Sequence, residues 1–479
     1  MKPRARASSH GGRRGTAAAT TLALLVAATL ALSGAGQPAP EPMLITGARL
    51  LDASAGRYQA VAGVLVDGER IAAVFARLPA GLPAGTRRID LPGATLVPGL
   101  GDMYATAAPS ASADADFYYA MALAHGVTMY RTVSSPVPWA ASQRDRVRAG
   151  DILAPRLWIG APRLDQQGAL GFSTRRVVDA AAARREVAQQ HSLGAEWILV
   201  SATTGPDVYR AIVGAAHAAK MRVSGEAGAT SGLDLIRVGV DAIDRLPFFA
   251  KSRAEYEQVA SSNPDYPRDD AGAADDYLWA QLPDDDARVV TAQMTRRGLF
   301  IIPMLGSFPS AIGDASALKQ DPAAALLPAR WRDDLQSRTH PDVWPGAQRA
   351  AAAAAARGRL LRRVMAAGVR VATGVDVEGG GYNVPGAGVH HELALLVAAG
   401  VSPADALRAA TVNCAGLLGA GDTLGQIGAG FSADLIAVDG DPLRRIEDLQ
   451  RIRLIVRGGE VLDRDALLEQ ARHAARPPQ

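Results

Sequence analysis

Short apolar segments separated by Gly, Asp and Pro occupy both ends of the chain. Near the N-terminus they read MLITGARLLD, AGVLVDGERIAAVFA and RRIDLPGATLVPGL, and near the C-terminus SADLIAVDGDPL and IRLIVRGGEVL. Alternation of apolar and polar positions between such turn residues is typical of short antiparallel strands. We therefore predict one composite β-sandwich domain formed by both ends of the chain, residues 43–95 plus 424–465.

Between these ends, short apolar segments alternate with helical stretches, which is the pattern of β/α units on a parallel sheet. Strands are expected near Leu96–Ala105, Val127–Val133, Arg156–Leu164, Trp197–Ala202, Met221–Ala227, Asp241–Leu246, Leu299–Leu305 and Val369–Val375. Their number predicts an α/β fold, a (β/α)8 TIM-like barrel, over residues 96–423.

Two segments interrupt this alternation. An acidic insertion is expected near residues 254–286, and a second insertion near 309–345 follows the seventh strand. Both would lie at the mouth of the barrel, where they could act as lids or simply decorate the surface.

The N-terminus has the pattern of an export signal. Five basic side chains precede the apolar run TLALLVAATLAL, and small residues follow it in SGA. This pattern predicts a signal peptide over residues 1–35 and a linker over 36–42, hence a periplasmic or secreted protein. Cleavage is favoured over a retained membrane anchor because the apolar run is short for a span.

Composition excludes several other classes of protein. The formal charge is +3 for the whole chain and −2 without residues 1–35, so no basic patch indicates a nucleic-acid partner. The single cysteine, Cys414, lies in a helical stretch and is expected to be a buried apolar residue. Nothing here sets the oligomeric state, and a homo-oligomer is compatible with the sequence.

Several motifs resemble the amidohydrolase superfamily, in its imidazolonepropionase- and prolidase-like branch. They include LVPGLGDMY, GVDAIDRLPF, AGVRVATGVD, HHELALLVAAGVSPADALRAAT and LGQIGAGFSADLIAVDGDPL. The resemblance implies hydrolysis of non-peptide C–N bonds with zinc, held by a His-x-His, a carbamylated Lys, two further His and an Asp. In this sequence those positions hold Tyr104 and Thr106, Leu199, Glu226, Arg245 and Asp376, so only the Asp is retained.

The substituted residues are poor ligands for a transition metal. Tyr104 and Thr106 offer neutral hydroxyls, Leu199 offers no donor atom, and the cationic Arg245 would repel a metal ion. We therefore predict no metal cofactor. Arg245 is instead expected to bridge Glu226 and Asp376 at the barrel mouth, with Tyr104 nearby, because two adjacent carboxylates need a counter-charge.

The predicted site is thus Asp376, Glu226 and Arg245 as tentative catalytic residues and Tyr104, Thr106 and His390 as binding residues. His390 matches a family segment, although a structural role suits it better than catalysis. A small-molecule ligand or substrate is expected at the mouth. Three functions remain open: a ligand-binding protein that has lost hydrolysis, an active hydrolase of amides, cyclic amides or esters with a remodelled centre, and a noncatalytic partner of an active paralogue. In the active hydrolase, Glu226 and Asp376 would act as an acid–base pair.

Overall fold

The computed structural model describes most of the chain beyond residue 40. The described residues are 41–106, 115–168, 174–246, 250–268, 271–307, 322–329, 331–333, 347–377 and 384–475. The predicted signal peptide, most of the linker and most of the insertion near 309–345 lie outside them. No helix within these ranges is long and apolar enough to cross a membrane.

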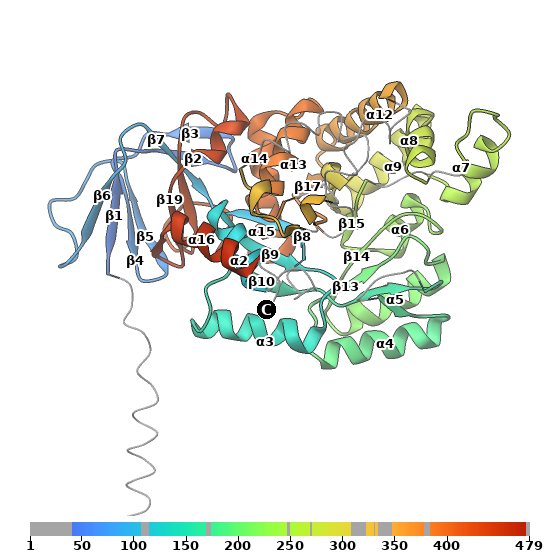
Figure 1. The fold of residues 1–479 in the computed structure, drawn as a ribbon, viewed down its shortest axis with the longest axis horizontal. Coiled ribbons are helices and arrows are strands. Elements are labelled where there is room, and N and C mark those ends of the chain that lie inside the picture. Colours follow the sequence, from blue (N-terminus) through green and yellow to red (C-terminus); the bar gives the residue numbers. More distant parts are fainter. Residues whose placement is uncertain are drawn as a thin grey trace, which may run out of the picture. The chain divides into compact units, whose positions relative to one another are not determined.

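Two β-sheets lie at one side of the barrel (Figure 1). A four-stranded sheet has the order β5-β4-β1-β6, built from β1 Met43–Thr46, β4 Gly63–Asp67, β5 Arg70–Phe75 and β6 Arg87–Asp90. A six-stranded sheet has the order β20-β19-β18-β7-β2-β3, built from β2 Arg49–Asp52, β3 Arg57–Gln59, β7 Ala94–Pro98, β18 Leu435–Asp439, β19 Ile452–Arg457 and β20 Glu460–Leu462.

The six-stranded sheet confirms that both ends of the chain pair with each other. Strand β18 runs antiparallel to β7, with Ile436 opposite Val97. Most strand pairs in these two sheets are antiparallel, as the pattern predicts, whereas β1 pairs with β6 and β2 with β7 in parallel. The chain passes from one sheet to the other between β1 and β2 and again between β6 and β7, so these pairs run in the same direction. The domain boundaries themselves stay a prediction.

The predicted barrel is present, with parallel pairing from strand to strand. Its strands are β8 Leu100–Ala105, β9 Val127–Thr132, β10 Arg156–Ile159, β11 Arg163–Asp165, β13 Trp197–Val200, β14 Arg222–Gly225, β15 Ala242–Asp244, β16 Phe300–Ile302 and β17 Arg370–Val371. Main-chain contacts join the three-stranded sheet β10-β9-β8 to the sheet that contains β11 to β17. On one side, Met103 N of β8 donates to Thr373 O, just after β17, at 2.9 Å. On the other side, Gly160, just after β10, forms a bridge with Trp197 of β13.

The first expected barrel strand is in fact two strands in two sheets. The expected strand Leu96–Ala105 divides at Gly99, whose N–H donates to Asp434 O at 2.9 Å. A Cβ at Gly99 would lie 2.2 Å from Thr128 Oγ1, so only glycine allows this close approach. Residues before Gly99 thus belong to the composite sheet and those after it to the barrel. The third expected strand likewise divides into β10 and β11, and β12 Thr174–Arg176 extends the sheet beside β11.

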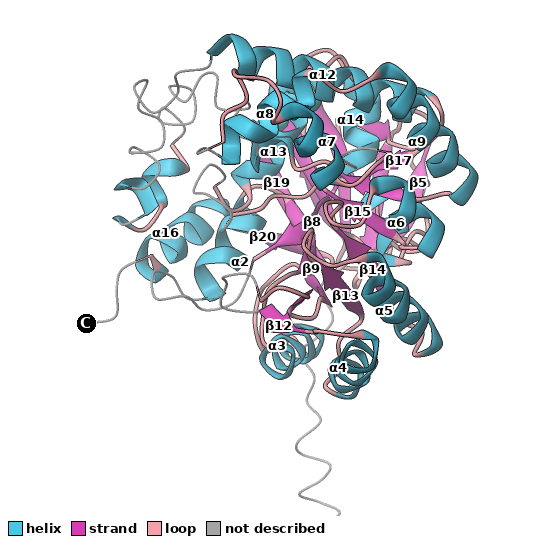
Figure 2. Cartoon of the chain, turned by 90° about the vertical axis from the view of Figure 1, so that its right-hand side faces the viewer, coloured by secondary structure: helices cyan, strands magenta, loops and turns pink. Residues whose placement is uncertain are grey.

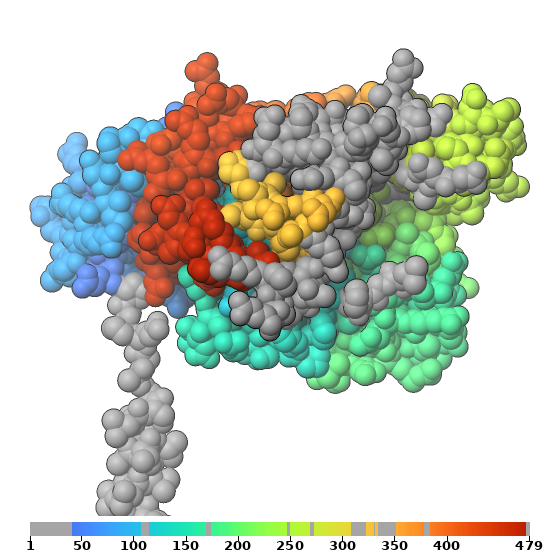
Figure 3. All heavy atoms as spheres, viewed as in Figure 1, coloured from blue at the N-terminus to red at the C-terminus, as the bar shows by residue number. Residues whose placement is uncertain are grey.

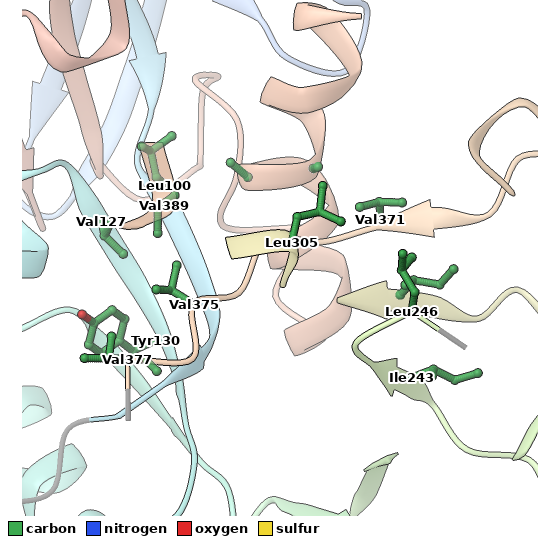
Figure 4. Packing of buried hydrophobic residues seen from close by; sticks show 14 of the residues in the cluster. Leu100, Val127, Tyr130, Ile243, Leu246, Leu305, Val371, Val375, Val377 and Val389 are labelled. Atoms are coloured by element: carbon green, nitrogen blue, oxygen red, sulfur yellow. The ribbon is translucent and has the colours of Figure 1, made fainter. Parts of the chain in front are cut away.

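Helices surround the strands (Figure 2). They are α2 Ala115–Ala124, α3 Val137–Ala149, α4 Ala180–Ser192, α5 Pro206–Ala218, α6 Gly232–Val238, α7 Arg253–Ala260, α8 Ala271–Ala280, α9 Asp284–Arg297, α12 Ala347–Ala366, α13 Ala387–Ala398, α14 Pro403–Ala410, α15 Val412–Leu418 and α16 Arg464–Ala474; 3-10 turns cover Leu305–Ser307, Ala324–Leu326 and Ile446–Gln450. Apolar side chains from strands and helices, among them Leu100, Val127 and Val389, form the core between the two layers (Figure 4).

The acidic insertion near 254–286 is helical rather than an irregular loop. It contains α7, α8 and the start of α9. Arg357 of α12 holds α8 in place through Asp275 and Asp276, each 2.9 Å away. At the other end of the chain, α16 packs on α2, and Arg464 Nε donates to Ala124 O at 2.9 Å. Figure 3 shows these C-terminal residues in red between the blue N-terminal strands and the cyan part of the barrel.

Candidate ligand-binding site

The centre of the site is Arg245, which follows β15 at the carboxyl end of the barrel. Its Nη2 lies 2.7 Å from Asp376 Oδ2 and its Nε 3.6 Å from Glu226 Oε1. Nη1 donates to Ser307 Oγ at 2.8 Å. Glu226 follows β14 and Asp376 follows β17, and carboxyl ends of parallel strands converge at one end of a barrel. The structure therefore brings together the three charged residues that the sequence analysis grouped.

The backbone of Arg245 is strained. Its φ of +63° lies in the left-handed region, which non-glycine residues adopt at a cost of about 1–2 kcal/mol. Ser134 after β9 and Met304 after β16 also have positive φ, at 60° and 46°. Such outliers persist where surrounding contacts over-determine them, and they gather at binding and active sites.

A second arginine, Arg163 of β11, completes the cluster and was missed by sequence reasoning. Its Nη2 donates to Tyr104 Oη, and its Nη1 lies 3.9 Å from Glu226 Oε1. Tyr104 Oη in turn lies 3.5 Å from the same Glu226 oxygen. The family pattern places no ligand on the third strand, and in β11, whose sequence is RLD, the only signal for Arg163 was its charge.

Below the mouth, a fully buried ion pair crosses the barrel interior. Arg131 Nη2 lies 2.8 Å from Asp244 Oδ1, and the exposed fractions of the two side chains are 0% and 2%. Arg131 also donates to Ser224 Oγ at 2.7 Å and to Met103 O at 2.5 Å. Asp244 immediately precedes Arg245 in the chain. This network fixes the ends of β14 and β15, from which Glu226 and Arg245 extend.

The neighbours of the two arginines keep both guanidinium groups in their cationic form. Burial lowers the pKa of Arg245, yet the carboxylates of Glu226 and Asp376 outweigh it and raise that pKa above its usual range. The neighbouring Tyr104 and Glu226 raise the pKa of Arg163. Burial raises the pKa of Tyr104 well above its usual range, so at neutral pH this residue is an uncharged phenol. The cluster thus contains two cations and two carboxylates.

The site does not fit the metal centre that the family resemblance implies. Arg245 lies between the two carboxylates that could have served as ligands. Leu199 is 1% exposed and packs among apolar side chains that include Met103 and Trp197, so it adds no donor atom. Within the described part of the chain, no group of three or more His, Cys, Asp or Glu side chains is placed to hold a metal ion. No step of a mechanism can be derived through zinc here.

The remaining predicted binding residues lie outside these contacts. Thr106 is 3% exposed at the end of β8, and no hydrogen bond joins it to Arg245 or Arg163. His390 is 4% exposed in α13, and its Nε2 lies 2.8 Å from His125 O. That contact ties α13 to the end of α2, which supports a structural role. Cys414 is fully buried in α15, as predicted.

An open pocket of about 570 Å³ lies at the same end of the barrel, after β11, β13 and β14. Its lining residues are Gln166, Gln167, Arg176, Val178, Thr203, Gly205 and Ala229. The buried Asp165 braces its wall by accepting hydrogen bonds from Ser201 Oγ at 2.6 Å and Thr203 Oγ1 at 2.8 Å. Amides, a hydroxyl and one guanidinium in this lining suit a polar ligand.

Comparison with known proteins agrees with the fold and the motifs. Residues 349–462 match the family model described as the amidohydrolase family. A Xaa-Pro dipeptidase with bound methionine in its active site is 19% identical with a TM-score of 0.64, over 88% of this chain and 100% of that chain. Bottromycin amidohydrolase is 21% identical with a TM-score of 0.65, over 95% and 97%. A prolidase complexed with N-methylphosphonate-L-proline is 21% identical with a TM-score of 0.63, over 88% and 99%.

The protein therefore has the fold of an amidohydrolase, and the resemblance to that superfamily is confirmed. Its structural neighbours include members of the prolidase-like branch. Comparison with curated proteins gives no match.

Proposed function

We propose that this amidohydrolase-like protein is exported and binds a small molecule at the barrel mouth, having lost metal-dependent hydrolysis. One observation carries the proposal: Arg245 lies between Glu226 and Asp376, where the family places its metal. A guanidinium there is permanently charged and attracts both carboxylates. A metal ion would have to displace it, and too few other ligands are at hand.

The loss of the metal removes the usual source of a nucleophile. Metal-bound water in this chemistry has a pKa near 7, whereas free water has a pKa of about 15.7. Asp376 is held by Arg245 at 2.7 Å, so its carboxylate is engaged in an ion pair rather than poised as a base against water. A small-molecule ligand remains consistent with the fold, because one structural neighbour holds methionine and another N-methylphosphonate-L-proline.

Metal analysis and a substrate screen test the proposal directly. The purified protein is incubated with Zn²⁺, Mn²⁺ or Mg²⁺, separated from free ions and assayed for metal content and for hydrolysis of amides, cyclic amides and esters. We expect far less than one ion per chain and no turnover above a heat-denatured control. One tightly bound zinc per chain would contradict the proposal.

The other two functions give different results in the same experiments. Turnover without metal that disappears in both Glu226→Gln and Asp376→Asn would establish a remodelled hydrolase instead. A second amidohydrolase chain that copurifies in a fixed ratio would favour a noncatalytic partner. A thermal-shift screen of small molecules then separates a binding protein, which some compounds stabilise, from a barrel without a ligand.

Export requires its own test. Cell fractionation of the full chain, with N-terminal sequencing of the mature protein, should find it outside the cytoplasm and cleaved near residue 35. A full-length cytoplasmic protein would contradict this part of the proposal.

A further inference from the structure

We propose that Arg163 and Arg245 together bind an oxyanion group of the ligand, and that a carboxylate is the group they accept. This inference rests on the proposed function, because it names the chemical class of the molecule bound at the mouth. It is carried by the hydrogen bonds, the exposure and the charges of the cluster.

Hydrogen-bond donors exceed acceptors in the cluster. A guanidinium has five N–H groups and no acceptor. Arg163 makes one hydrogen bond, to Tyr104 Oη, and Arg245 makes two, to Ser307 Oγ and Asp376 Oδ2. The other contacts of these arginines among the described residues are ion pairs of 3.6 and 3.9 Å, too long for hydrogen bonds. A ligand at this place must therefore supply acceptor atoms.

Neighbouring hydroxyl groups cannot meet this demand. Ser307 Oγ already accepts from Arg245 and donates to Met304 O at 2.7 Å. Tyr104 Oη accepts from Arg163 and is directed towards Glu226. Within the described part of the chain, these hydroxyls are already used in the cluster and no further acceptor lies within hydrogen-bond distance of the remaining guanidinium N–H groups, which leaves those groups for water or a ligand.

The exposed side of the cluster is cationic although its total charge is balanced. The side chains of Arg163 and Arg245 are 27% and 29% exposed. Those of Glu226 and Asp376 are 12% and 6% exposed, behind the arginines. An approaching molecule meets guanidinium groups first, and two planar forks match the geometry of a carboxylate.

Charge counting favours a carboxylate over a phosphate. The two arginines are already offset by Glu226 and Asp376, so one added negative charge leaves the cluster at −1 and a phosphate dianion leaves it at −2. The pocket of about 570 Å³ lies at the same end of the barrel, and the single charged residue in its described lining is Arg176. A small organic monoanion fits these features best.

The test compares compounds that differ in one charge. A panel of N-acetylamino acids is set against their primary amides and against inorganic phosphate, with affinity measured by thermal shift and isothermal titration calorimetry. We expect carboxylates to bind and their amides to bind at least about 10-fold more weakly, since hydrogen bonds to charged groups contribute about 1.5–3 kcal/mol.

Variants of Arg163 test whether its guanidinium takes part in the binding. Arg163→Gln should weaken carboxylate binding about 10- to 100-fold, and Arg163→Lys, which keeps the charge but loses the fork, should give an intermediate loss. Arg175→Gln is the matched control, because Arg175 belongs to neighbouring β12 and its side chain is 52% exposed. The affinity of the Arg175→Gln variant for carboxylates should equal that of the unmodified protein.

Several outcomes would overturn the inference. Tighter binding of amides or of phosphate than of carboxylates would do so, as would no binding across the panel or an unchanged affinity in a folded Arg163→Gln variant. A neutral ligand found in the wider screen would refute the carboxylate but leave the proposed binding function intact, whereas zinc-dependent turnover would refute that function itself.

Discussion

Replacing Arg245 by methionine tests whether the guanidinium takes over the electrostatic role of the family metal. Methionine keeps much of the apolar stem of arginine but removes the charge and every N–H donor. Glu226 and Asp376, with side chains 12% and 6% exposed, would then face each other without their shared cation.

The size of the effect follows from burial. Removing one partner of a buried ion pair costs about 3–5 kcal/mol, because the other charge is left uncompensated. Since 29% of the Arg245 side chain reaches solvent, we reduce this to about 2–3 kcal/mol of unfolding free energy. The left-handed backbone at this position is strained with either side chain, so this strain does not contribute to the difference in unfolding free energy between the variant and the unmodified protein.

Urea denaturation followed by tryptophan fluorescence measures this loss, since Trp197 and Trp279 are fully buried. The triple variant Arg245→Met, Glu226→Gln, Asp376→Asn should regain part of the lost stability, because it removes both unpaired carboxylates and leaves only Arg163, whose side chain is 27% exposed, without its carboxylate partner. Arg237→Met is the matched control: Arg237 lies 3.0 Å from Asp234, but the pair is 65% and 42% exposed. Its loss should stay below about 0.5 kcal/mol.

Two results would refute the electrostatic reasoning. The first is a single variant as stable as the unmodified protein, which would mean that the carboxylates do not need Arg245. The second is a triple variant no more stable than the single one, which would assign the loss to packing.

Three further predictions concern the interior. Burial raises the pKa of Glu392 from 4.5 to about 7, so between these pH values the folded state retains a proton that the unfolded state releases. The free energy of unfolding should therefore fall as the pH rises from about 4.5 to about 7. Urea denaturation of the Glu392→Gln variant over that pH range should show a weaker fall. Burial raises the pKa of Cys414 to about 12, so this thiol should resist alkylation at pH 8 until urea is added, as mass spectrometry can show. Arg131→Met should cost about 3–5 kcal/mol in urea unfolding because Asp244 would remain buried without a partner, and a loss below 1 kcal/mol would contradict this.

Much of the site could be predicted because it depends on local patterns. Each barrel strand is a short apolar run, and the residue after it lies at the mouth. Once the strands near Met221–Ala227, Asp241–Leu246 and Val369–Val375 were recognised, the convergence of Glu226, Arg245 and Asp376 followed from parallel strands ending on the same side. The residues at the positions where the family resemblance implies metal ligands can also be read from the sequence, although their replacement of those ligands stays a prediction.

Residue types and their spacing along the chain were thus enough to predict the order of the strands and the pairing of both chain ends. Only the tertiary structure decided that Arg163 reaches Tyr104, 59 residues away, that Arg131 pairs with Asp244 and that the chain changes sheets at Gly99. Those features depend on strand register and on the direction of long side chains across the barrel. Contacts between distant segments determine the strand register and the side-chain directions, and a local sequence pattern does not predict these contacts.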